Sequence, residues 1–139
     1  MTQIAVAHAS STAAPSAFFA RWADMATWQQ WNADTEWARL DGPFAEGATG
    51  VLKPKGGPQV KFHIASLTDR EFVDVSTLFG ARLTFDHQIS STADRTHVAV
   101  TVTLTGPMGW FWNLAIGKGI RSGLQQDLNQ LVAVAEAAA

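Results

Sequence analysis

The chain has 139 residues with 47% hydrophobic side chains, which matches one globular domain over residues 1–139 and leaves no room for a second one. Ten basic and twelve acidic side chains give a formal net charge of −2, and no two basic residues adjoin, so the electrostatic signature of nucleic-acid binding is missing. Cysteine is absent, which excludes disulfides, thiolate metal sites and cysteine nucleophiles.

The chain begins with a predicted strand over residues 3–9. Ile4, Val6 and His8 alternate there with small or polar residues, and alternation is typical of a half-buried strand. His8 therefore shares the face of its two apolar neighbours. Because it lies at the end of the strand, we expect it in a structural or rim position.

Two short helices are predicted next. Pro15 suits the first turn of a helix, in which Phe18 and Trp22 then share one face. Asp24 is the expected N-cap of the second helix, which contains two tryptophans three residues apart. These are Trp28 and Trp31.

A sheet is predicted between Asp34 and Thr105. Apolar residues recur there with a period of two, and clusters of Gly, Pro and Asp interrupt them at regular intervals. This pattern is typical of antiparallel strands joined by hairpins. The strands are expected near residues 35–41, 48–54, 58–67, 70–77, 81–90 and 96–105, which makes seven with the first strand.

A long amphipathic helix is predicted from about Trp110 to Ala137. One stripe of this helix must face the sheet. The stripe comprises Trp110, Asn113, Gly117, Ile120, Leu124, Leu128, Leu131 and Ala135. Glycine inside a helix costs about 1 kcal/mol, so the glycines here indicate close backbone approach, a bend or room for another group.

The order of elements predicts an α+β fold. A curved, seven-stranded antiparallel sheet wraps around the long C-terminal helix, with two short helices after the first strand. A strongly curved sheet and a straight helix do not meet along their whole length. We therefore expect an internal cavity between the sheet and the C-terminal helix.

Several short motifs, in this order of elements, resemble the SRPBCC superfamily of START and pollen-allergen-like helix-grip domains. The closest resemblance is to its small bacterial polyketide cyclase/dehydrase branch, and it covers the whole chain. The motifs are Trp28-Gln29-Gln30-Trp31, Gly42-Pro43-Phe44-Ala45-Glu46-Gly47, Phe85-Asp86-His87 and Thr105-Gly106-Pro107. None is a catalytic signature, so they mark fold and branch alone.

The resemblance implies binding of a hydrophobic or aromatic small molecule, such as a lipid, in the internal cavity. The alternative that it implies is an enzyme of the polyketide cyclase or dehydratase type, with His87 as general acid or base and Asn113 orienting a carbonyl group. No cofactor is expected in either case. The expected ligand contacts are Trp28, Trp31, Trp37, Phe62, Phe85, His87, Asn113 and Gly117.

His87 is the main candidate for chemistry. It shares a strand face with Leu83, Phe85 and Ile89, so its imidazole should point inward among hydrophobic neighbours. Two roles are open: a core histidine bonded to a backbone carbonyl or a water, or a pocket residue that bonds a ligand or transfers a proton. Asp86 cannot pair with it, because adjacent strand residues point to opposite faces.

The remaining candidates leave similar alternatives. Asn113 is either a turn residue at the start of the helix or a polar anchor at one end of the cavity. The tryptophans near the N-terminal helices are either core residues or part of the mouth of the cavity. Gly117 lies on the helix stripe, where a missing side chain leaves room.

The other polar residues are not expected to form a catalytic or metal site. His63 and His97 are out of phase with their apolar neighbours and should face solvent. The four histidines lack metal-ligand spacing, so no metal is expected. Glu36 shares a predicted face with Ala38 and Leu40 and could reach inward, but no role is assigned to it.

The aromatic run Trp110–Trp112 cannot face inward as a whole at the start of a helix, so at least one ring should be exposed. An exposed ring could act as a lid, a homodimer contact or a foot on a membrane surface. A protein-interaction module at this edge is therefore a third function open to the chain. With no signal peptide and no apolar stretch that could span a bilayer, we expect no integral membrane segment and a cytoplasmic location.

Overall fold

The computed structural model describes residues 2–138. The N-terminal part comprises β1 (Thr2–Ser11), α1 (Pro15–Ala23) and the 3₁₀-helix η1 (Met25–Gln30). The next strands are β2 (Thr35–Asp41), β3 (Thr49–Pro54), β4 (Val60–Leu67), β5 (Glu71–Leu78), β6 (Ala81–Ser91) and β7 (Thr96–Thr105). The C-terminal part comprises α2 (Gly109–Trp112), the π-helical turn η2 (Asn113–Gly117) and α3 (Lys118–Ala138).

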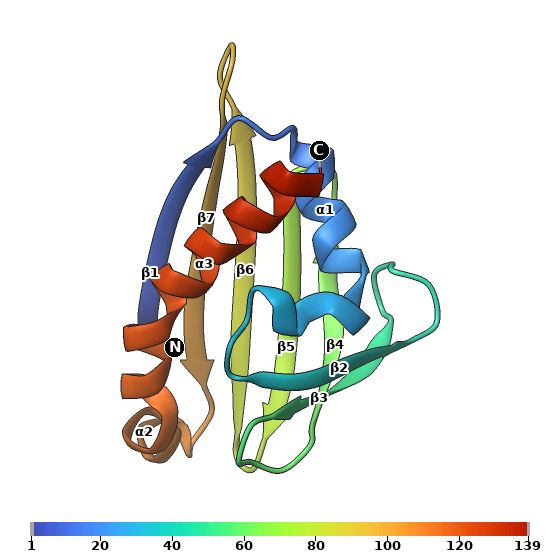
Figure 1. Ribbon diagram of the computed structural model, residues 1–139. Coiled ribbons are helices and arrows are strands. Elements are labelled where there is room, and N and C mark those ends of the chain that lie inside the picture. Colours follow the sequence, from blue (N-terminus) through green and yellow to red (C-terminus); the bar gives the residue numbers. More distant parts are fainter. Residues whose placement is uncertain (1, 139) are drawn as a thin grey trace.

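The strands form one antiparallel sheet in the order β1-β7-β6-β5-β4-β3-β2. From β2 to β7, each strand pairs with the next strand in the chain. The first strand, β1, pairs with the other edge of β7. Figure 1 shows α3 (orange to red) running across the sheet beside β1, with α1 and η1 on the same side of the sheet. The predicted α+β fold, a seven-stranded sheet wrapped around a long C-terminal helix, is confirmed.

The core lies between this inner face of the sheet and the helices. In β7 every second residue points inward, and the four apolar ones are almost fully buried. These are Val98, Val100, Val102 and Leu104. Phe18 and Trp22 of α1 and Leu131 of α3 cover them from the helical side. Burying each such side chain contributes about 1.5–3 kcal/mol, so the two layers depend on each other.

The second short helix begins differently from the prediction. Asp24 makes no side-chain capping hydrogen bond at the start of η1. Its backbone carbonyl instead accepts hydrogen bonds from the backbone N–H and the hydroxyl of Thr27. Asp24 therefore has the predicted N-cap position, but the tight 3₁₀ turn is closed through its backbone and not through its carboxylate.

A π-helical turn interrupts the C-terminal helix and changes which residues face the sheet. An i→i+5 turn holds one extra residue, so residues before it are rotated relative to those after it. Leu128, Leu131 and Ala135 are buried as predicted, but Trp110 is 66% exposed. Trp112 and Ile116 pack against the core in its place. The N-terminal end of the predicted stripe is therefore wrong.

Among the described residues, no helix is long and apolar enough to cross a bilayer.

A β-bulge in β1 reverses the face on which His8 lies. The register with β7 shifts between Gln3 and Ala5, so residues after the bulge point opposite to the prediction. Ala7 is buried, whereas Val6 is 47% exposed and His8 is exposed on the outer face. The prediction that His8 shares an inward face with Ile4 and Val6 is wrong.

A second bulge, in β2, turns the side chain of Glu36 to the outer face of the sheet. The register with β3 shifts between Thr35 and Trp37. Glu36 is exposed and its carboxylate lies 3.1 Å from the ammonium group of Lys53. It does not reach inward with Ala38, because the extra residue turns its side chain to solvent.

Candidate functional site

Two titratable side chains lie side by side on the inner face of the sheet. In the β5–β6 pair, Phe72 is opposite His87 and Asp74 is opposite Phe85. Cross-strand partners point to the same face, so His87 and Asp74 occupy diagonal positions on it. Each is only 7% exposed. The predicted inward orientation of His87 is confirmed.

His87 is enclosed by aromatic rings. Its ring centroid lies 4.8 Å from that of Phe72 and 5.1 Å from that of Trp22. Its Nδ1 lies 2.9 Å from the carbonyl oxygen of Phe72, and because a carbonyl only accepts, Nδ1 carries the proton. Burial lowers the pKa of His87 to about 4, against a smaller rise from this hydrogen bond. The imidazole is therefore neutral near pH 7, with the lone pair on Nε2.

Asp74 is the polar residue that the sequence analysis missed. No hydrogen bond joins its carboxyl to another described residue, and burial alone raises its pKa from 3.8 to about 7. Near neutral pH the group therefore exists in both forms and can donate or accept a proton. Val73 and Val75 make the other face of β5 equally apolar, which hid its orientation. The available signal was that Asp74 has the same phase as Phe72.

Two indole donors of the helical layer also lack partners. Trp22 Nε1 and Trp31 Nε1 are buried with no hydrogen-bond partner among residues 2–138. Trp28 Nε1, by contrast, donates to the carbonyl oxygen of Trp22 at 3.0 Å. Most buried donors in proteins are paired, so the two free indoles are available to an additional group in the interior.

Several expected ligand contacts lie in this interior. Trp28 stacks on Phe62 with 6.4 Å between ring centroids and contacts Trp31 at 5.5 Å. Phe85 is half-buried and lies 6.4 Å from the ring of His87. The structure thus brings these residues to one side of the sheet, and their contact with a ligand stays a prediction.

Trp37 does not belong to this group. It alternates with the buried Ala38 and so lies on the outer face, where the guanidinium of Arg39 lies 5.9 Å from the centre of its ring. It is not part of the buried core. Its predicted place at the cavity is wrong, because Trp37 has the opposite phase to Ala38 and Leu40 in the strand.

Asn113 and Gly117 take part in a hydrogen bond between side chains of the C-terminal helical segment. Asn113 Oδ1 accepts a hydrogen bond of 2.9 Å from Arg121 Nη1. A Cβ atom on Gly117 would overlap Asn113 Oδ1 and lie 2.9 Å from Arg121 Nη1. Gly117 therefore makes room for this bond and not for a ligand. A contact of Asn113 with a ligand stays a prediction, and Asp74 is the polar group next to His87 on the inner face.

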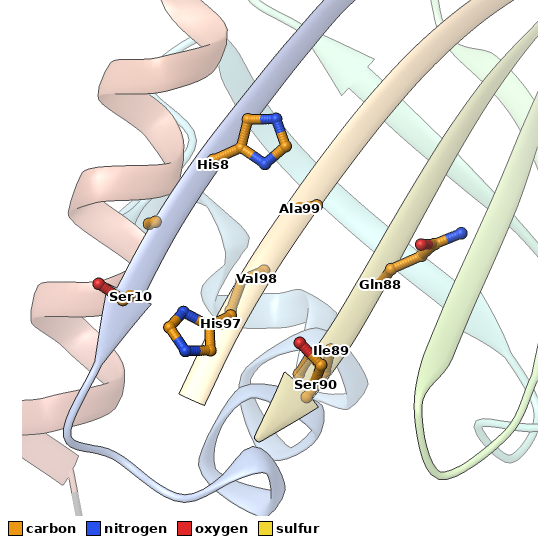
Figure 2. A pocket seen from close by; sticks show the side chains of 9 residues that line it. His8, Ser10, Gln88, Ile89, Ser90, His97, Val98 and Ala99 are labelled. Atoms are coloured by element: carbon orange, nitrogen blue, oxygen red, sulfur yellow. The ribbon is translucent and has the colours of Figure 1, made fainter. Parts of the chain in front are cut away.

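Two shallow hollows lie on the outer face of the sheet. One has a volume of about 490 Å³. Figure 2 shows its lining, with His8 on β1, His97 on β7 and Gln88 on β6. A second, over β2 to β5, includes His63. The outward orientation of His63 and His97 is thereby confirmed.

The predicted cavity between the sheet and the C-terminal helix is not among these hollows. Large rings from α1 and η1 take up the space over β4 to β6. They are Phe18, Trp22, Trp28 and Trp31. These aromatic side chains bridge part of the distance between the curved sheet and the helices, and the internal cavity stays a prediction. Within residues 2–138, no three His, Asp or Glu side chains gather as a metal site would require.

No protein-family model matches the sequence, and no curated protein matches it. Solved structures match its fold. MLL2253 from Mesorhizobium loti has a TM-score of 0.75 at 13% identity, over 96% of this chain and 97% of that one. Ara h 8.0201 has a TM-score of 0.67 at 10% identity, over 95% and 96%.

A third similar structure belongs to a larger protein. DynU16, described as a putative protein in the dynemicin biosynthetic locus, has a TM-score of 0.70 at 14% identity. The match covers 96% of this chain and 47% of DynU16, so the chain spans about half of that protein. At such identities the similarity shows the fold. The chain has the helix-grip fold to which its sequence motifs pointed.

Proposed function

We propose that this helix-grip protein binds a hydrophobic, aromatic small molecule between the inner face of its sheet and the helices. The observation that carries the proposal is Asp74, a buried carboxyl group without a hydrogen-bond partner on the inner face. A buried polar group of this kind is costly unless another group pairs with it. Support also comes from DynU16, which has the same fold and whose description places it in a biosynthetic locus.

The polar atoms of the interior define what the ligand must carry. Asp74 can accept or donate a hydrogen bond, Nε2 of His87 accepts one, and the indoles of Trp22 and Trp31 donate. The surrounding rings favour a planar apolar frame. The ligand is therefore an aromatic or polycyclic molecule with hydroxyl or carbonyl substituents.

Ligand entry requires side chains to move, because aromatic rings occupy part of the interior. The residues best able to move are those that line it without being fully buried. On the sheet side these are Phe44 and Phe85, and on the helix side they are Ile116, Ile120 and Leu124. A ligand that displaces them exchanges one set of apolar contacts for another.

Two related probes test the proposal. The protein should bind 2-naphthol more tightly than naphthalene, because only the former carries a hydroxyl group for the buried polar atoms. Each of Asp74→Asn and His87→Ala should weaken 2-naphthol binding by about 1–2 kcal/mol, and His97→Ala should change it by almost nothing. Isothermal titration calorimetry gives the affinities.

A ligand carried from the cell gives a second readout. Native mass spectrometry of the protein purified from its own host should show a bound small molecule that is lost on denaturation. Equal affinities for naphthalene and 2-naphthol, together with no bound molecule in the native spectrum, would sink the proposal. Equal losses in the His87 and His97 variants would show that the inner face is not where the probe binds.

A second candidate function is acid–base catalysis on the bound molecule. The observation that favours it is the diagonal placement of His87 and Asp74, whose pKa values burial moves to about 4 and about 7. A neutral imidazole with a free Nε2 can take a proton, and a protonated carboxyl can give one. A cyclisation or dehydration needs both steps.

Product analysis separates the two candidates. A carrier returns its ligand unaltered after long incubation. An enzyme converts it, and loss of its acid or base should cost about 10² to 10⁴ in rate in Asp74→Asn or His87→Ala. Asp86→Asn is the matched control, because that carboxyl lies on the opposite face of β6.

A further inference from the structure

Four large apolar side chains stand exposed at one end of the molecule. Phe79, in the turn between β5 and β6, is 80% exposed. Trp110, Phe111 and Leu114, in α2 and η2, are exposed by 66%, 43% and 78%. We call these four residues the apolar tip. Figure 1 shows the β5–β6 turn and α2 at the same end of the fold.

The two segments of the apolar tip are held together by hydrogen bonds. Trp112 Nε1 donates to the carbonyl oxygen of Phe79 at 2.8 Å, and the backbone N–H of Met108 donates to that of Gly80 at 2.9 Å. Gly80 has a φ of +68°, and a Cβ atom there would collide with the side chain of Met108. The exposed rings are thus presented on a fixed frame and need little ordering to bind.

The two segments that carry the apolar tip contain basic but no acidic side chains. Residues 75–85 and 105–126 contain Arg82, Lys118 and Arg121 but no Asp or Glu. All three basic side chains are exposed. The chain as a whole has more acidic than basic residues, so this end is set apart from the rest of the surface. Exposed aromatic rings beside basic side chains are the combination that favours an anionic lipid surface.

We propose that the apolar tip docks the protein on the surface of an anionic membrane. The rings enter the headgroup region, and Arg82, Lys118 and Arg121 pair with lipid phosphates. A second copy or a protein partner fits the tip less well, because a stable protein interface uses about 20–30 residues on each side. Docking of this kind does not depend on a ligand inside the fold.

Vesicle co-sedimentation of the full chain tests this docking. The wild type should bind vesicles of phosphatidylcholine mixed with phosphatidylglycerol at least about tenfold more tightly than vesicles of phosphatidylcholine alone. The double variant Phe79→Ser, Trp110→Ala should lose about tenfold or more of this binding. Lys118→Glu and Arg82→Glu should each weaken it by about fivefold or more.

Two matched controls lie elsewhere on the surface. Val6→Ala removes an exposed apolar side chain from β1, and Lys61→Glu reverses an exposed charge on β4. Both should bind vesicles like the wild type. Unchanged circular dichroism and thermal unfolding of every variant ensure that lost binding does not report lost folding.

Three results would overturn docking at the apolar tip. One is a wild type that binds neither vesicle. Another is binding that the tip variants leave intact or that Val6→Ala reduces equally. The third is self-association in analytical ultracentrifugation, without vesicle binding, that Phe79→Ser, Trp110→Ala abolishes, which would assign the tip to a second copy of the chain. Brominated lipid should quench the wild type more strongly than Trp110→Phe, since Trp110 is the indole placed in the membrane.

Discussion

Nδ1 of His87 donates a 2.9 Å hydrogen bond to the backbone carbonyl oxygen of Phe72 on the neighbouring strand. This bond fixes the tautomer of a buried imidazole and leaves Nε2 free. His87 is thus a satisfied core residue at one nitrogen and an available acceptor at the other. The core and pocket roles that the sequence left open are therefore compatible in one side chain.

His87 should make the fold sensitive to acid. Its pKa in the folded state is about 4, below the ordinary value of 6.5, so the unfolded chain takes up the proton first. The stability that the neutral imidazole contributes is complete above pH 6.5 and is lost as the pH falls towards 4. The difference between the pKa values of the unfolded and folded states corresponds to about 3 kcal/mol in the free energy of unfolding.

Urea unfolding of His87→Gln tests this pH dependence. The variant should lose about 3 kcal/mol less free energy of unfolding than the wild type between pH 7 and pH 4. The exposed His97→Gln should follow the wild type. Parallel pH profiles for all three proteins would contradict burial of a neutral His87.

Asp74 should act in the opposite sense. The pKa of Asp74 in the folded state is about 7, above the ordinary value of 3.8. The stability that the protonated carboxyl contributes to the fold is therefore complete below pH 3.8 and is lost as the pH rises through 7. Asp74→Asn should raise the free energy of unfolding by up to about 4 kcal/mol at pH 8 and change it little at pH 4. Asp94→Asn, in the exposed β6–β7 turn, should have equal effects at both pH values. A loss at pH 8 would show that the carboxylate is well paired.

Two glycines of the C-terminal helix should respond to alanine with opposite signs. At Gly117 a Cβ atom would displace Asn113 Oδ1 from its bond with Arg121, so Gly117→Ala should cost about 1–3 kcal/mol. At Gly119 nothing lies within 4 Å, so Gly119→Ala should stabilise by about 1 kcal/mol. Thermal unfolding distinguishes them. Equal shifts would show that the π-helical turn relaxes freely.

Gln125 should protect the free edge of β1. Its Nε2 donates to the carbonyl oxygen of His8 at 2.8 Å, and its Oε1 accepts from the N–H of His8 at 3.3 Å. Gln125→Ala should cost about 1–2 kcal/mol and accelerate hydrogen exchange at His8, because the strand edge loses its partner. The exposed Gln126→Ala is the control. Slow exchange at His8 in both variants would refute this role.

The amino-acid sequence by itself determined the order of elements and the faces of the strands with clear alternation. Each predicted strand has its observed bounds within two residues, because Gly, Pro and Asp clusters stop strands locally. His87 was placed inward correctly, since it has the same phase as Leu83 and Ile89, whereas the alternate residues of the strand are polar. Such patterns depend on neighbours within one strand and need no knowledge of the rest of the fold.

Only the tertiary structure decided which way side chains point where a bulge or a π-helical turn adds one residue to the regular strand or helix pattern. The bulges in β1 and β2 turned His8 and Glu36 outward, and the π-helical turn took Trp110 out of the predicted stripe. An inserted residue reverses a strand face at small local cost, and packing against other elements selects whether it occurs.

The tertiary structure also decided the make-up of the interior. Asp74 lies in a strand that is apolar on both faces, and pairing with β4 and β6 assigned the face that it shares with Phe72 to the interior. Whether a cavity remained depended on how far the rings of α1 and η1 reach across the sheet. Both are properties of contacts between residues distant in sequence, which a local pattern does not encode.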